Sequence, residues 1–196
     1  MPPVAEGLRE RGKKRRTEAI LDAGLQLLRE DPERHFTVDR VAARAEVSPM
    51  TVFNLIGNRE QLWSAMADRA LDGLDLSTIT GADPEQRAHR IVDEVVRVLR
   101  SDAVVFRVLL SGWARSGQLL AHDPSAALTA CLEAARQRAQ DRGDVKSEVS
   151  VRRVGEVLAA GLVGTIHQWT SGVIGDRAFT TRAHAVVEVA FLAVQA

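Results

Sequence analysis

Apolar residues recur at helical spacing along most of the chain, and the strict alternation typical of a half-buried strand is absent. The segment 17–30 shows the pattern clearly, because Ile20, Leu21, Leu27 and Leu28 are spaced as on one face of a helix. The sequence therefore predicts an all-α protein. Similar stripes predict further helices at about 37–45, 48–56, 58–72, 84–100, 102–115, 123–143, 145–171 and 180–196.

The stretch AEVSPMTVFNLIGN, residues 45–58, begins a helix firmly and ends it within about two turns. Ser48 supplies a capping oxygen, and Pro49 occupies the first helical position, where its missing N–H costs nothing. The residues that follow are poor helix formers, since most are β-branched, aromatic or amide side chains. Such a helix depends on packing by its neighbours, for which Val52 and Ile56 supply an inward face. Its outward side chains are then free to serve contact with a partner.

Three short helices between about 17 and 56 can close on one small core. Thr51 and Asn54 remain on the outer face of the third helix, where an amide can pair with adenine and a hydroxyl with a phosphate oxygen. This arrangement is typical of a helix-turn-helix whose last helix enters the major groove of DNA. The expected core residues are Leu27, Leu28, Phe36, Val41, Ala42, Val47, Val52 and Ile56.

The chain has no net charge, with 26 basic and 26 acidic residues, but the charges are unevenly distributed. Six basic residues and only one acidic residue lie between Arg9 and Arg16. A basic arm of this kind attracts phosphate, although a solvated tail without a partner has the same composition. We expect the arm to assist DNA binding, in the adjacent minor groove.

The composition is that of an ordinary globular protein, with 45% hydrophobic and 27% charged residues. No apolar run approaches the roughly 20 residues of a membrane span, and the basic N-terminal segment lacks the apolar region of a secretory signal. Cys131 is the only cysteine, which excludes an internal disulfide and fits a reducing compartment. We therefore expect a cytoplasmic protein with no membrane partner.

The segment TEAILDAGLQLLREDPERHFTVDRVAARAEVSPMTVFNLIGNREQLWSAM resembles the N-terminal domain of the TetR family of bacterial transcriptional regulators. The resemblance extends over about residues 15–71, and it depends on the spacing of the first helix, on FTVDRVAARAEVS, on Ser-Pro-x-Thr and on Asn-Arg-Glu-x-Leu. The remaining chain resembles the family only in length and helical pattern. The helix-turn-helix pattern and the resemblance together assign contacts with double-stranded operator DNA to Arg15, Arg16, Thr37, Ser48, Pro49, Met50, Thr51, Phe53, Asn54 and Arg59.

Four positions depart from the family's usual pattern. Glu46 stands in the turn where glycine is common, at a position that is often left-handed. Phe53 replaces a tyrosine whose hydroxyl reaches phosphate, Leu55 replaces histidine or another polar residue, and Ile56 replaces phenylalanine. The basic Arg59 is retained. We expect the recognition helix to make weaker phosphate contacts than is usual in the family, with the basic arm compensating.

The sequence divides into a basic N-terminal arm at 1–16, a helix-turn-helix DNA-binding domain at 17–60 and a ligand-binding and dimerisation domain at 61–196. The loop DLSTITGADP is the clearest seam between two folded parts.

A single helix-turn-helix covers too little of the groove to bind specifically, so a second half-site about 34 Å away is expected. The last two helices carry small residues that allow a second helix to approach closely. The resemblance implies that these helices pair with their copies in a four-helix bundle, which makes the protein a homodimer. An intramolecular core is the alternative for the same apolar stripes. The expected interface residues are Leu158, Gly161, Leu162, Val187, Ala190 and Phe191.

An effector pocket is expected mostly from the resemblance, which implies that a small molecule inside the second domain changes the spacing of the two DNA-reading domains. His167 is a polar residue in an apolar helix and Cys131 a solitary thiol, but both are also typical of a protein core. The chain has no tyrosine, and the candidate positions carry little charge, which favours a neutral or apolar effector. The candidate lining residues, with ordinary core packing as the alternative for each, are Phe106, Leu110, Trp113, Leu128, Cys131, His167 and Trp169.

Catalytic motifs are absent from the sequence: there is no glycine-rich phosphate loop, no nucleophile elbow and no pair of carboxylates in an apolar setting. The five histidines lack metal-ligand spacing with one another or with Cys131. We therefore expect no enzyme activity, no metal and no cofactor. The sequence predicts a homodimeric repressor that binds a palindromic operator and is released by a small effector. Two alternatives remain open: a constitutive, ligand-independent DNA-binding regulator, and an all-helical enzyme or interaction module.

Overall fold

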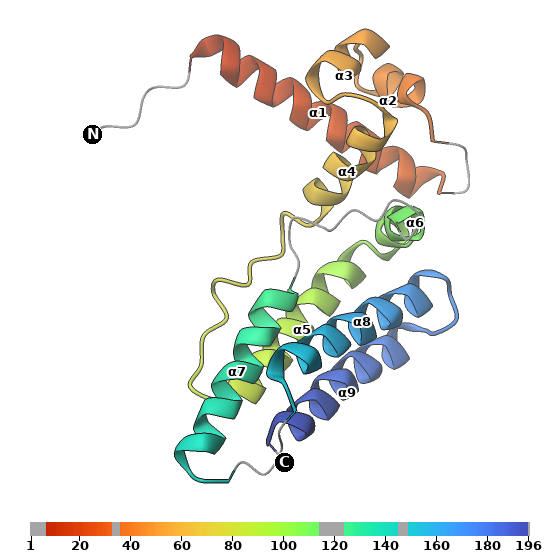
Figure 1. Cartoon of the computed structure of the whole chain (residues 1–196). Helices are drawn as coiled ribbons and strands as arrows, with labels where there is room; N and C mark the ends of the chain where they lie inside the picture. The colour runs from red at the N-terminus through yellow and green to blue at the C-terminus, as the bar shows by residue number, and fades with distance from the viewer. Residues whose placement is uncertain (1–6, 33–35, 114–123, 145–148, 196) are drawn as a thin grey trace. The chain divides into compact units, whose positions relative to one another are not determined.

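The computed structural model describes residues 7–32, 36–113, 124–144 and 149–195 of this 196-residue chain. The described residues form helices joined by turns and loops, with no strand among them (Figure 1), which confirms the all-α prediction. No helix among them is long and apolar enough to cross a membrane. The helices are α1 (Leu8–Glu30), α2 (Val38–Arg44), α3 (Pro49–Leu55), α4 (Arg59–Ala70), α5 (Pro84–Ser101), α6 (Ala103–Trp113), α7 (Ser125–Asp141), α8 (Val151–Thr170) and α9 (Asp176–Gln195).

The chain divides into two compact units, Met1–Leu71 and Asp72–Ala196. The division follows α4, between the boundary at 60 and 61 and the loop DLSTITGADP at 75–84 that the sequence suggested as a seam. Helix α4 belongs with the first unit because it packs against α1. Met66 is fully buried there, and Gly24 of α1 makes room for it, since a Cβ at position 24 would lie 2.6 Å from the Met66 Sδ.

Helix α1 is longer than the sequence pattern predicts. Residues 8–16, expected as an arm ahead of the first helix, form its first turns. The amphipathic pattern begins only after position 16, but arginine, lysine and glutamate are themselves strong helix formers, so the helix extends outward into solvent. The later turns of α1 are anchored by the buried side chains of Ile20, Leu21, Leu25 and Leu28.

The short helices α2 and α3 begin at the caps that the sequence predicts. The Thr37 hydroxyl accepts a hydrogen bond from the Arg40 backbone N–H at 3.3 Å. The Ser48 hydroxyl accepts one from the Thr51 backbone N–H at 3.1 Å. Of the expected core residues, Leu28, Phe36, Val41, Ala42 and Val52 are buried, whereas Leu27, Val47 and Ile56 are only half-buried.

Helix α4 begins with a reciprocal capping box. The Asn58 side chain accepts from the Gln61 backbone N–H, and the Gln61 side chain accepts from the Asn58 backbone N–H, both at 2.9 Å. The turn that leads into this capping box is short, because α3 ends at Leu55 and α4 begins at Arg59.

In the second unit, α5, α7, α8 and α9 pack against one another, and α6 contacts α5 and α8. Helices α8 and α9 lie side by side (Figure 1). Helix α8 begins at Val151 and α9 at Asp176, rather than near 145 and 180 as the apolar stripes suggested; residues 145–148 lie outside the described residues. The largest fully buried side chains of this unit include Phe106, Trp169, Phe179 and Phe191.

Candidate functional site

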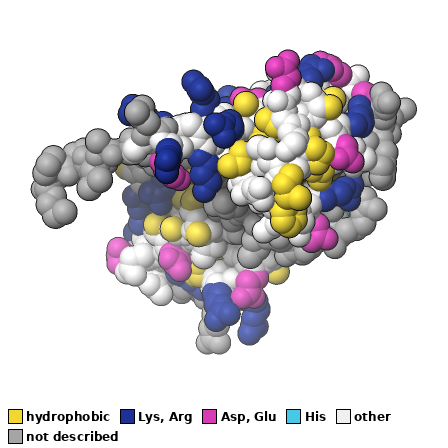
Figure 2. All heavy atoms as spheres, turned by 90° about the horizontal axis from the view of Figure 1, so that it is seen from above, with side chains coloured by type: hydrophobic (Ala, Val, Ile, Leu, Met, Phe, Trp, Pro, Cys, Tyr) yellow, Lys and Arg dark blue, Asp and Glu magenta, His cyan; other side chains and the backbone are white. Residues whose placement is uncertain are grey.

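Helix α3 presents one inward and one outward face. Val52 is fully buried and anchors the helix, while Met50 and Phe53 are 64% and 60% exposed. Asn54 is also exposed, and Thr51 is half-buried. Figure 2 shows the face of the molecule seen from above, on which hydrophobic side chains gather together with many Lys and Arg side chains. The outward face of α3 is therefore apolar at two positions and polar at a third.

The hydroxyl groups predicted to contact DNA are used within the protein. Ser48 Oγ and Thr51 Oγ1 lie 2.9 Å apart and share a hydrogen bond, in addition to the cap described above. The Thr37 hydroxyl is likewise engaged in capping α2. These three residues fix the start of each short helix, and Pro49, which is exposed, continues α3 from its cap.

Glu46 has a left-handed backbone, with φ at 55°, and it is the one non-glycine residue with positive φ among those described. The family resemblance places glycine at this position. A glutamate here carries the steric strain of the left-handed region, and its exposed carboxylate lies two residues before the cap of α3.

The basic residues in the first turns of α1 are exposed and form no ion pair with any described carboxylate. Because α1 is helical here, these side chains radiate from it instead of lying along one arm. Arg9, Lys13 and Arg16 share one stripe, in line with the buried Ile20. Arg11 and Arg15 point to the other side of the helix. The sequence-predicted contacts Arg15 and Arg16 therefore belong to different faces.

The remaining arginines of the first unit are held by neighbouring groups. The Arg44 guanidinium donates to Glu30 at 2.9 Å, and its hydrogen bonds hold the pKa of the Glu30 carboxyl below its usual value. Arg69 donates to Asp22 through two nitrogens, at 3.0 and 3.3 Å. Arg59, predicted to contact phosphate, is exposed and donates through Nε to the Phe36 carbonyl at 3.4 Å. No sequence motif indicated these pairs, because their members lie far apart along the chain.

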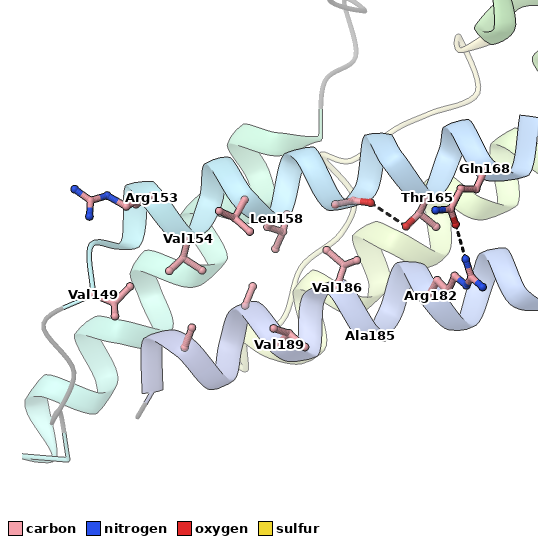
Figure 3. A pocket seen from close by; sticks show the side chains of 14 residues that line it. Val149, Arg153, Val154, Leu158, Thr165, Gln168, Arg182, Ala185, Val186 and Val189 are labelled. Atoms are coloured by element: carbon pink, nitrogen blue, oxygen red, sulfur yellow. Dashed lines mark hydrogen bonds between the residues drawn. The ribbon is translucent and has the colours of Figure 1, made fainter. Parts of the chain in front are cut away.

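An apolar groove of about 620 Å³ lies along the exposed sides of α8 and α9 (Figure 3). Val157 and Val189 line it and are 70% and 66% exposed, and Arg182 donates to Gln168 at one end. Val186 of α9 packs over Gly161 of α8, where an added Cβ would lie 3.0 Å from the valine Cγ1. The small residue thus allows two helices of the same chain to approach closely.

The groove divides the residues predicted for a dimer interface into two groups. Leu158, Gly161 and Ala190 line the groove, although Leu158 and Ala190 are themselves buried. Val187 and Phe191 are buried in the core of the unit, and Leu162 is half-buried against an interior cavity, so these three do not lie on the exposed face. The apolar residues that these helices expose are different ones, among them Val157 of α8 and Val189 and Leu192 of α9.

A small interior cavity of about 30 Å³ lies between α5, α7, α8 and α9. Leu128, one of the residues proposed from the sequence for an effector pocket, lines this cavity together with Leu162 and Phe179. His167 is exposed instead of facing the interior, because it lies on the outer side of α8. Phe106, Leu110, Cys131 and Trp169 are buried but do not line the cavity, and the side chain of Trp113, at the end of α6, lies outside the described residues.

Buried polar contacts explain two of these core positions. The Trp169 indole stacks on Phe179 with ring centres 4.9 Å apart, and its N–H donates to Asp176 Oδ1 at 2.8 Å. The Cys131 sulfur accepts a hydrogen bond from Arg87 Nε at 3.2 Å. Both side chains therefore have structural partners.

Two histidines that are far apart in the sequence meet between α5 and α9. The Nδ1 atoms of His89 and His184 are 2.7 Å apart, and His184 Nε2 lies 2.9 Å from an Asp93 carboxylate oxygen. The sequence spacing did not indicate this contact. In the part of the chain that the structure describes, no group of three His, Cys, Asp or Glu side chains is arranged to hold a metal ion.

No protein-family model matches the sequence, and no curated protein matches it either. Solved structures do match its fold. NalD, the secondary repressor of the MexAB-OprM multidrug efflux pump in Pseudomonas aeruginosa, has a TM-score of 0.59 and 21% identity, with 93% of this chain and 96% of that chain covered.

Two further structures are similar. A TetR-family transcriptional regulator from Mesorhizobium loti has a TM-score of 0.52 and 18% identity, with 93% of this chain and 97% of that chain covered. A TetR-like regulator from a Rhodococcus species has a TM-score of 0.50 and 17% identity, with 88% and 93% covered. The chain therefore has the fold of the TetR-family transcriptional regulators.

Proposed function

We propose that this protein is a TetR-type transcriptional regulator that binds a palindromic operator as a homodimer and acts as a repressor. The outward face of α3 carries the proposal. The helix is capped at Ser48 and anchored by Val52, so Met50, Phe53 and Asn54 are presented together on a rigid support. A short helix held this way in a helix-turn-helix is suited to enter a major groove.

The basic turns of α1 support the same proposal. Their charges have no intramolecular partner among the described residues, so they remain available to phosphate oxygens. Elsewhere in the first unit, Arg44 and Arg69 are paired with the carboxylates of Glu30 and Asp22. Phosphate contacts would thus come chiefly from α1, and base contacts from α3.

Selection of bound duplexes from a random pool by the full-length protein tests this function. We expect an enriched palindrome whose half-sites are separated by about one helical turn or a multiple of it. Asn54→Ala should weaken binding about 5- to 150-fold for each half-site and relax the preference at one position of each half-site, as expected when a bidentate pairing with a base is removed. An unenriched pool at low salt would contradict the proposal.

The groove on α8 and α9 supports a homodimer. It is long, open and mostly apolar, and its exposed valines are left uncovered by the chain itself. A second copy that presents the same face would bury both sets of valines in a twofold interface.

The interior cavity supports release by a neutral or apolar effector, since its lining is wholly apolar. At about 30 Å³ it has room for about one water molecule, so an effector would have to enlarge it. This small volume also favours the second candidate function, a constitutive DNA-binding regulator. Thermal unfolding with a panel of apolar and neutral metabolites distinguishes them: a compound that raises the Tm and lowers operator affinity supports the regulated form, and no response across the panel supports the constitutive one.

A further inference from the structure

The first unit exposes two large hydrophobic side chains among its described residues, and both belong to α3. Met50 and Phe53 are three positions apart, so they lie on the same face of the helix. Elsewhere in this unit the large apolar side chains that the structure describes are buried or half-buried. The exposed pair is therefore a local feature of the helix that the proposed function places in the major groove.

We propose that Met50 and Phe53 read the C5-methyl groups of thymine, so that apolar contact specifies at least one thymine in each half-site of the operator. This inference rests on the proposed function, because it requires α3 to enter the major groove. It adds the chemical feature of the base that the helix recognises and the two side chains that recognise it.

Met50 and Phe53 cannot recognise a base through strong hydrogen bonds, so apolar contact is the means of recognition left to these two positions. The Thr51 hydroxyl is held by Ser48 at 2.9 Å. Phe53 has no hydroxyl, and Met50 offers only a weak acceptor. Asn54 is the exposed residue of this helix that can pair with a base edge. The exposed Met50 and Phe53 side chains can discriminate bases only through shape and apolar contact.

Thymine supplies the matching apolar group. Among the base edges in the major groove, only thymine carries a methyl group, while the others present hydrogen-bond donors and acceptors. The surroundings favour a nucleic acid over a basic protein as the partner of this apolar pair. The unpaired basic side chains of α1 belong to the same unit and would repel a basic partner while attracting a polyanion.

Replacement of thymine by uracil in the selected operator, one position at a time, tests the inference. Uracil removes the methyl group and keeps the hydrogen-bonding pattern of the base. We expect at least one position per half-site at which uracil weakens binding of the wild-type protein about fourfold, the change expected for one buried methyl group. Met50→Ala or Phe53→Ala should lower this sensitivity to less than about twofold at its own position.

Phe53→Tyr is the matched control, since it keeps the ring and adds only a hydroxyl; it should retain the sensitivity to uracil. Both side chains are exposed, so the alanine variants should keep the wild-type Tm.

Three outcomes separate the inference from the proposed function. Tight, sequence-specific binding that is indifferent to uracil at every position overturns the thymine readout and leaves the proposed function standing. Equal weakening by the alanine variants on thymine and uracil duplexes also overturns it, because it assigns the two side chains to the sugar-phosphate backbone. Failure to bind any duplex, with capture of a protein partner by the same face, overturns both.

Discussion

Replacing Val189 by aspartate should convert the proposed homodimer into monomers. Val157, Val189 and Leu192 are 70%, 66% and 69% exposed on α8 and α9. Full burial of such a side chain contributes about 1.5 to 3 kcal/mol, so about 1 to 2 kcal/mol remains to be gained at each. Of these residues, Val157 and Val189 line the groove. A twofold interface buries each of them twice, so the two together contribute about 4 to 8 kcal/mol.

This gain is comparable with the cost of association, about 4 to 15 kcal/mol, so the interface has little margin. Aspartate at 189 removes the contribution of one valine from each protomer and brings two carboxylates into an apolar setting. We expect the dimer Kd to rise by about a hundredfold or more. Sedimentation velocity over a concentration series measures this change.

Val173→Asp provides the matched control. Val173 is 72% exposed, lies in the turn between α8 and α9, and does not line the groove. This variant should keep the wild-type Kd. If Val189→Asp dimerises like the wild type, or if both variants dissociate equally, the groove is not the interface.

Three further predictions concern the first unit. Lys13→Gln with Arg16→Gln should lower the salt slope of operator binding by about four, two for each protomer of the dimer, because each residue neutralises one phosphate; affinity against salt concentration measures this. Glu46→Gly should raise the free energy of unfolding by about 0.5 to 1 kcal/mol, because glycine relieves the left-handed strain at φ 55°, although it also gains freedom in the unfolded chain; denaturant unfolding measures this. Glu30→Gln should remove a small acid-dependent part of the stability: the lowered pKa of Glu30, caused by hydrogen bonds from Arg44, stabilises the fold above the usual carboxyl value of 4.5 and ceases to do so as pH falls through the lowered value.

Each of these predictions has an internal comparison. Arg11→Gln with Arg15→Gln removes the same charge from the opposite side of α1, so the two double variants should change the salt slope by different amounts; equal effects from both pairs would contradict the stripe assignment. Glu46→Ala removes the carboxylate but keeps a Cβ, so a stability gain equal to that of glycine would contradict backbone strain as the cause. A stability profile of Glu30→Gln that matches the wild type at every pH would show that the exposed pair contributes nothing measurable.

Local signals in the sequence predicted the helix-turn-helix well. Ser48 and Pro49 fix the start of α3, and Asn58 with Gln61 forms the capping box of α4, because caps depend only on neighbouring residues. The start of α1 was missed for a physical reason: its first turns are helical through intrinsic propensity alone, so they carry no apolar stripe to be recognised.

The exposed face of α8 and α9 could not be predicted from periodicity. Both helices carry two apolar stripes, and spacing alone does not indicate which stripe meets the core. The structure buries Val187 and Phe191 and exposes Val189 instead. Contacts between distant residues, such as the 2.7 Å approach of His89 to His184, depend on the tertiary arrangement and leave no local pattern.

The close contact between Gly24 of α1 and Met66 of α4 has a mechanical consequence. The two helices are in contact there, and the Arg69–Asp22 ion pair joins them again about one turn further along α4. Helices α1 and α4 therefore move together as one rigid element. A displacement of Leu71, the last residue of the first unit, would therefore rotate this whole unit instead of bending it.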